Sequence, residues 1–437
     1  MFLFLFISLF FSRVWALDIP HKTYQLPNGL SVILIEDHSI PQVTVDIWYA
    51  VGSSDDPKGA SGFAHLFEHL MFMGTQRIPQ GEFDTRMETY GGWNNASTAN
   101  DYTNYYSVGP SALLDLLLFL EADRMVGLDI TQQKLDLQRD VVRNERRQNY
   151  EDQPYGSIWL SLSEMMYPPG HPYHLEGIGS HEDLEAATLN TVTQFYSDWY
   201  MPNNATLCVS GDFDPNTIEE KIETYFSPIP AQKLPKRFVA EEQQQPHTPE
   251  VTLYDQIQIP AVVLAWHSPK YLSPGDAELD VVSQVLAGGN DGRLIPKFVL
   301  EEERVQEMHV FQYSHQKGSL FIMQVFVRPG NDLQKLVADI HAEIAIIADQ
   351  SNPITEEDLR LSVKDLEMNF YSGLESNLAR AEKLQSLKHH TGSTSNIQML
   401  LSRYQDIQLQ DVHTTIQKYL SPEKAGVIYV YPKGEEQ

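Results

Sequence analysis

A proline-rich stretch in the middle of the chain divides the sequence into two parts of similar size. Residues 228–249, PIPAQKLPKRFVAEEQQQPHTP, lack hydrophobic periodicity and include five prolines and three consecutive glutamines, a composition typical of a linker. A chain of 437 residues is also too long for one ordinary hydrophobic core. The sequence therefore predicts two domains, residues 17–229 and 250–437, joined by a linker at 230–249.

The order of the expected elements is similar on the two sides of this linker. Before it, strands precede a helix that begins near Ser61, further helices follow, and ATLCVSGDF is a strand. After it, two strands precede a short helix, long helices are expected at 332–349 and 355–390, and AGVIYVYP closes as a strand. These periodicities predict an α+β fold of two homologous halves, each a mostly antiparallel sheet packed with helices.

The N-terminus has the composition of a secretory signal peptide. Residues 2–11 are almost wholly apolar, and Val14-Trp15-Ala16 places small residues where a signal peptidase cleaves. The alternative is a buried first strand. We predict a signal peptide at residues 1–16 and no membrane span after its removal, since no window has about 20 uninterrupted apolar residues. With Cys208 as the sole cysteine, no internal disulfide can form, which favours a bacterial periplasmic or secreted protein.

The net charge excludes one class of partner. The formal charge is −28 at pH 7, so a phosphate backbone would be repelled and nucleic acid is not an expected partner.

A polar cluster interrupts the apolar stretch FAHLFEHLMFMGTQ at residues 63–76. On a helix His65 and His69 share one face, as two nitrogen ligands of a zinc ion would. Glu68 lies beside them, where it could take a proton from a zinc-bound water. The alternative is a pair of surface histidines on a packed helix. A catalytic zinc ion usually has three protein ligands, so a third must come from elsewhere.

Several motifs together resemble one enzyme family. HLFEH is the H-x-x-E-H order of the inverted zinc-protease motif, and Glu145 follows in RDVVRNERRQNYEDQPYG. NGLSVILIED, NNASTANDYTNYY and FYSDWYMPNNATLCVSGDFDP extend the similarity over nearly the whole mature chain. The sequence resembles the pitrilysin-type inverted-motif zinc peptidases, in particular the bacterial periplasmic members related to mitochondrial processing peptidase.

This resemblance implies roles for individual residues. His65, His69 and Glu145 would bind one Zn²⁺ per chain, and Glu68 would be the general base. Asn95 and Ala96 would lie on an edge strand to which an extended peptide adds. From the residues alone, Glu145 also fits a solvated charged helix, and Asn95 a turn or a strand end.

The sequence also departs from the family pattern. Gln138 stands where many members have a second glutamate, seven residues before the ligand glutamate. Glu301 and Met308 stand where single-chain active members have an Arg and a Tyr that hold the substrate. The resemblance then implies a zinc-bearing subunit whose second homologous subunit supplies the Arg/Tyr pair. The function predicted is a zinc metalloendopeptidase that hydrolyses peptides or unfolded segments; the alternative is a non-catalytic structural or peptide-binding subunit.

Overall fold

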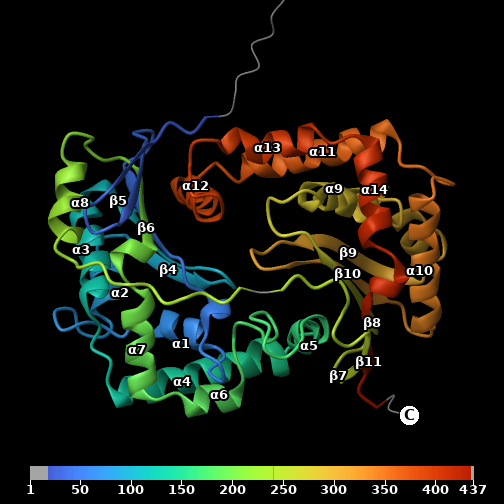
Figure 1. Cartoon of the computed structure of the whole chain (residues 1–437), viewed down its shortest axis with the longest axis horizontal. Helices are drawn as coiled ribbons and strands as arrows, with labels where there is room; N and C mark the ends of the chain where they lie inside the picture. Colours follow the sequence, from blue (N-terminus) through green and yellow to red (C-terminus); the bar gives the residue numbers. More distant parts are fainter. Residues whose placement is uncertain (1–17, 240, 435–437) are drawn as a thin grey trace, which may run out of the picture.

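The computed structural model describes residues 18–239 and 241–434, so the predicted signal peptide lies outside the described residues. Two β-sheets, each with helices on both faces, lie side by side (Figure 1). The sheet of the first half has the strand order β1-β2-β6-β3-β5-β4. Its strands are β1 (Lys22–Gln25), β2 (Ser31–Glu36), β3 (Gln42–Tyr49), β4 (Trp93–Thr98), β5 (Thr103–Pro110) and β6 (Ala205–Gly211).

The second sheet repeats this pattern without a counterpart of β1. Its order is β7-β11-β8-β10-β9. In the first sheet β2 pairs parallel with β6, and in the second β7 pairs parallel with β11, while every other pair is antiparallel. The prediction of two related, mostly antiparallel halves is therefore confirmed. The strands are β7 (Glu250–Asp255), β8 (Ala261–Ser268), β9 (Val305–Tyr313), β10 (Ser319–Val327) and β11 (Gly426–Pro432).

Fourteen α-helices accompany the sheets in the described part of the chain, and none of them is long and apolar enough to cross a membrane. The first half contains α1 (Phe63–Leu70), α2 (Glu82–Glu88), α3 (Leu114–Val126), α4 (Gln132–Arg146), α5 (Ser157–Met166), α6 (His181–Ala186), α7 (Leu189–Trp199) and α8 (Ile218–Phe226). The second contains α9 (Asp276–Ala287), α10 (Leu333–Ala348), α11 (Glu356–Ser372), α12 (Asn377–Thr391), α13 (Ile397–Gln405) and α14 (Leu409–Tyr419).

The prediction of one helix at 355–390 is wrong, because two helices occupy this segment. Helix α11 ends at Ser372 and Gly373 follows it. The side chain of Ser376 then accepts a hydrogen bond from the backbone N–H of Ala379. Such an N-cap starts a new helix by satisfying an otherwise free N–H group. The break lets α12 leave its own half.

Helix α12 covers a face of the first sheet, although it belongs to the second half of the chain (Figure 1). Its Leu384, fully buried, packs with Ile33 and Cys208. Gln385 donates hydrogen bonds to the carbonyl oxygens of Asp46 and Thr206 on two strands of that sheet. The helix therefore stabilises the first half through both apolar and polar contacts.

Helix α5 makes the reciprocal exchange. It precedes the linker, yet its Ile158, Leu162 and Met166 pack in one cluster with Val263 and Ile322 of the second sheet. Each sheet thus has one face covered by a helix from the opposite half. Each half therefore packs a helix against the sheet of the other half. The division of the chain at the 230–249 linker stays a prediction from the sequence, and it does not imply two units that fold independently.

The exchange makes a prediction about stability. Leu384→Ala is expected to lower the free energy of unfolding by about 2–5 kcal/mol, because it leaves a cavity against the first sheet. The matched control is Leu361→Ala on α11, where the side chain is 40% exposed and the change should be within about 0.5 kcal/mol. Urea unfolding measures both, and equal stabilities of the two variants would contradict the packing described.

Candidate metal centre

The helix that carries the polar cluster begins at a fixed point. The carboxylate of Asp56 accepts hydrogen bonds from the backbone N–H groups of Gly62 and Ala64, at 2.7 and 2.8 Å. Gly62 has φ of +83°, and a Cβ there would lie 2.8 Å from the carbonyl oxygen of Ile178. Only glycine fits both conditions without strain. These contacts set where α1 starts and hence where its side chains point.

Helix α1 separates its residues by polarity. Its apolar side chains lie in the core of the first half, where Phe67 packs against Phe195 and Tyr200. The side chains of His65 and His69 are only partly buried, with 15% and 23% of each exposed. The spacing predicted from FAHLFEHL therefore brings both imidazoles to one face of the helix.

Glu145 reaches this face from α4. Its Oε2 lies 3.7 Å from His65 Nε2 and 3.4 Å from His69 Nε2, and one ligand atom from each residue lies within 4.8 Å of the others. Donor atoms about 2.1 Å from a tetrahedral zinc ion lie about 3.4 Å apart. The set of two imidazoles and one carboxylate also has the chemistry of a catalytic zinc site. The three side chains therefore fit a zinc ion. No other such group was found among residues 18–239 and 241–434.

The pKa shifts of two of the three side chains, His65 and Glu145, favour the deprotonated forms that bind a metal ion. Burial lowers the pKa of His65 to about 4, so its ring is neutral and keeps a lone pair. A hydrogen bond with His69 holds the pKa of Glu145 below its usual value. Burial opposes protonation of His69, but the neighbouring carboxylates raise its pKa overall.

Glu68 lies beside the three side chains without being one of them. Burial raises the pKa of its carboxyl group, which makes the carboxylate a stronger base. Thr98 Oγ1, at the end of β4, donates a hydrogen bond of 2.6 Å to Glu68 Oε2. Thr98 was not identified from the sequence, since a threonine in a strand carries no signal of this contact. Gln138, one departure from the family pattern, donates a hydrogen bond to Met73 Sδ at 2.8 Å.

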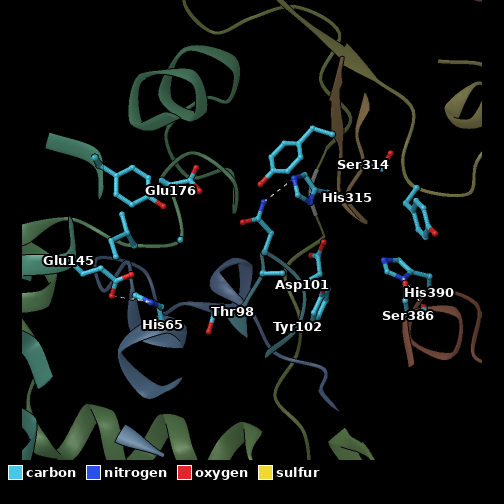
Figure 2. A pocket seen from close by; sticks show the side chains of 17 residues that line it. His65, Thr98, Asp101, Tyr102, Glu145, Glu176, Ser314, His315, Ser386 and His390 are labelled. Atoms are coloured by element: carbon cyan, nitrogen blue, oxygen red, sulfur yellow. Dashed lines mark hydrogen bonds and ion pairs between the residues drawn. The ribbon is translucent and has the colours of Figure 1, made fainter. Parts of the chain in front are cut away.

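A cavity of about 430 Å³ adjoins the group. His65 and Glu145 lie on one side of it, and Ser386 and His390 of α12 lie on the opposite side (Figure 2). Both halves of the chain therefore form its walls. The second half contributes Tyr271, Tyr313, Ser314, His315, Ser386 and His390.

The remaining predicted residues are not members of this group. Asn95, exposed, and Ala96, buried, lie on β4, the outermost strand of the first sheet. Glu301 is exposed at the end of the helical turn Pro296–Glu301, and Met308 is buried in β9. Neither of the last two supplies the cationic or phenolic group that the family uses.

Two family models match this two-half chain, and one of them includes the side-chain group. Residues 31–167 match the model described as Insulinase (Peptidase family M16). Residues 186–366 match the model described as Peptidase M16 inactive domain. The chain belongs to peptidase family M16. Its first matched segment contains the three residues of the inverted motif, His65, Glu68 and His69, and the distant Glu145.

Individual relatives carry zinc-protease names. Zinc protease PqqE from Helicobacter pylori is 27% identical over 421 residues, covering 94% of this chain and 93% of the relative. The uncharacterized zinc protease YmxG from Bacillus subtilis is 22% identical, covering 94% and 98%. The crystal structure of a protease from Helicobacter pylori superposes with a TM-score of 0.86 at 25% identity, covering 94% of this chain and 100% of that one.

Proposed function

We propose that this protein is a zinc-dependent endopeptidase acting on peptides or unfolded segments. One observation carries the proposal: His65, His69 and Glu145 converge within zinc-ligand distances beside Glu68, at the wall of a cavity. The zinc-protease names of the relatives support it. The alternative of a non-catalytic subunit has less support, because all four side chains are in place.

The chain's own residues would divide the work of peptide hydrolysis. When bound at His65, His69 and Glu145, a zinc ion supplies a Lewis acid that polarises a carbonyl group and lowers the pKa of water. Glu68, whose own pKa is raised by burial, accepts the proton of the attacking water and passes it to the leaving amine. Thr98 holds the Glu68 carboxylate in one orientation.

An extended substrate would bind along β4. This strand has one free edge in the order of its sheet, so its unpaired backbone groups can accept a further strand. Asn95 and Ala96 lie midway along it. Backbone pairing of this kind places few demands on the substrate's sequence, which suits a peptidase for peptides and unfolded segments.

We also propose that the protein works in the periplasm, together with a second homologous subunit. The predicted signal peptide and the single, buried Cys208 support export to that compartment. The second subunit would supply the Arg and Tyr that Glu301 and Met308 replace.

The metal ligands can be tested by zinc content. His65→Ala is expected to reduce bound zinc from about one ion per chain to well below half, because it removes one of three protein ligands. Elemental analysis of the dialysed protein measures this. His309→Ala is the matched control, since His309 lies exposed on β9 and pairs with Glu307. Equal zinc in both variants would reject the assignment.

The base can be tested separately from the metal. Glu68→Gln is expected to keep its zinc and to lower kcat by about 10²–10⁴-fold, because the amide accepts no proton at neutral pH. The measurement is cleavage of an unfolded reporter peptide with parallel zinc analysis. Unchanged cleavage would assign the base role elsewhere. Absence of zinc-dependent cleavage in the wild type, both alone and with the second subunit, would favour the non-catalytic alternative.

The second subunit can be tested by reconstitution. The chain alone is expected to cleave peptides at least about tenfold more slowly than a mixture with a homologous chain that has the Arg/Tyr pair. Titration of one chain with the other, followed by peptide cleavage and sedimentation, measures this. Full zinc-dependent activity as a monomer would contradict the heterodimer.

A further inference from the structure

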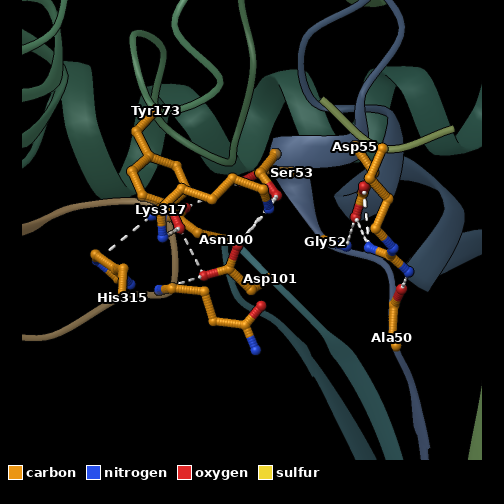
Figure 3. A network of polar contacts seen from close by, with 12 residues as sticks. Ala50, Gly52, Ser53, Asp55, Asn100, Asp101, Tyr173, His315 and Lys317 are labelled. Atoms are coloured by element: carbon orange, nitrogen blue, oxygen red, sulfur yellow. Dashed lines mark hydrogen bonds and ion pairs between the residues drawn. The ribbon is translucent and has the colours of Figure 1, made fainter. Parts of the chain in front are cut away.

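The tip of the β9–β10 hairpin, residues 314–318, reaches from the second half into the first. Lys317 Nζ lies 2.7 Å from Asp101 Oδ1 in the turn between β4 and β5, and the two side chains are only 13% and 5% exposed. Figure 3 shows this hairpin tip against the turn. The contact joins the two halves of the chain at the base of the strand to which a substrate would add.

The Asp101 carboxylate is fully engaged. Besides Lys317, its oxygens accept hydrogen bonds from the Gln316 backbone N–H, the Tyr173 hydroxyl and Ser54 Oγ, at 3.1, 2.6 and 3.2 Å. The Tyr173 oxygen in turn accepts from the Lys317 backbone N–H at 2.9 Å. A buried ion pair with this many hydrogen bonds selects one geometry, and removing one partner leaves an uncompensated charge.

The turn that carries Asp101 is tightly constrained. It is closed by the pairing of Thr98 with Thr103 and by a 2.8 Å hydrogen bond from Ala99 N–H to the Tyr102 carbonyl oxygen. A Cβ on Gly52 would lie 2.3 Å from the Ala99 carbonyl oxygen, so the backbone on the other side is also in close contact. A displacement of Asp101 therefore moves Thr98, three residues earlier.

Thr98 links this turn to the catalytic centre through its hydrogen bond to Glu68. We propose that Lys317 is a positioning residue for the catalytic base: through Asp101 it fixes the β4–β5 turn, and the turn fixes Thr98 and thereby Glu68. This inference rests on the proposed function. It gives a role to the segment matched by the inactive-domain model, residues 186–366, which holds Lys317 but none of the metal-binding side chains.

The first experiment compares two lysine variants of the full chain, assayed in the form that cleaves peptides, alone or with the second subunit. Lys317→Met is expected to lower kcat about tenfold, as a misplaced general base loses part of its effect, with KM unchanged within about twofold. Lys335→Met is the matched control, because Lys335 is exposed and pairs with Asp339 on its own helix. Zinc content should equal that of the wild type in both.

A double variant protects the test against misfolding. Asp101→Asn with Lys317→Met removes both buried charges, which avoids the cost of an unpaired one, and should show the same loss of kcat. A change in KM with an unchanged kcat would overturn the proposal. Identical kinetics for Lys317→Met and Lys335→Met would also overturn it.

A double-mutant cycle tests the route through Thr98. Thr98→Val removes the hydrogen bond to Glu68, so Lys317→Met should have little further effect on kcat in that background. Lys317→Met could instead lower kcat by the same factor in the wild-type and the Thr98→Val backgrounds. Lys317 and Thr98 would then act independently, and the proposed route would be wrong.

Hydrogen exchange separates this inference from the proposed function. Backbone amides of residues 93–103 are expected to exchange faster in Lys317→Met than in the wild type, while those of α7 keep their rates. Unchanged exchange at 93–103 would show that Lys317 does not fix the β4–β5 turn, even in an active enzyme. A wild type without zinc-dependent cleavage would reject the proposed function and, with it, the role of Lys317 in catalysis, even where exchange shows that Lys317 fixes the turn.

Discussion

The structure depends on how each β-sheet buries its second apolar face. A sheet in the interior of a protein has two faces to cover, and here one of them is covered by a helix from the opposite half. Helix α12 provides Leu384 to the first sheet, and α5 provides Leu162 to the second. Neither half has a complete core without the other. The first sheet, in the half that carries the candidate metal centre, thus depends on a helix from the other half of the chain.

The candidate metal centre uses this rigidity. The apolar side of α1 lies in the main core of the first half, and its polar side faces Glu145 and the cavity. A metal site needs its ligands held before the ion arrives, and packed helices provide this better than loops do. Both walls of the cavity carry polar side chains, since the second half adds tyrosine and histidine side chains. The half without metal ligands therefore contributes to the shape of the site and, through Lys317, to its geometry.

Much of this site could be predicted from the sequence because its signals are local. His65, Glu68 and His69 lie within five residues on one helix, and helical spacing alone brings them to one face. Glu145 came from the family resemblance, since nothing in RDVVRNERRQNYEDQPYG distinguishes a ligand from a solvated charge. Periodicity located most strands and helices, but it joined α11 and α12 across Gly373. The exchange of α5 and α12 could not be predicted, because an amphipathic helix does not specify which sheet it covers.

The helix exchange has a consequence for the order of events during synthesis. The apolar face of α5 has no partner until the strands β8, β10 and β11 have been made, and one face of the first sheet stays uncovered until α12 follows. A nascent chain therefore cannot complete its first half early, in contrast to chains whose domains fold one after another. Delayed folding suits a protein with a predicted signal peptide, since a polypeptide that is threaded through a membrane must remain unfolded until most of it has crossed.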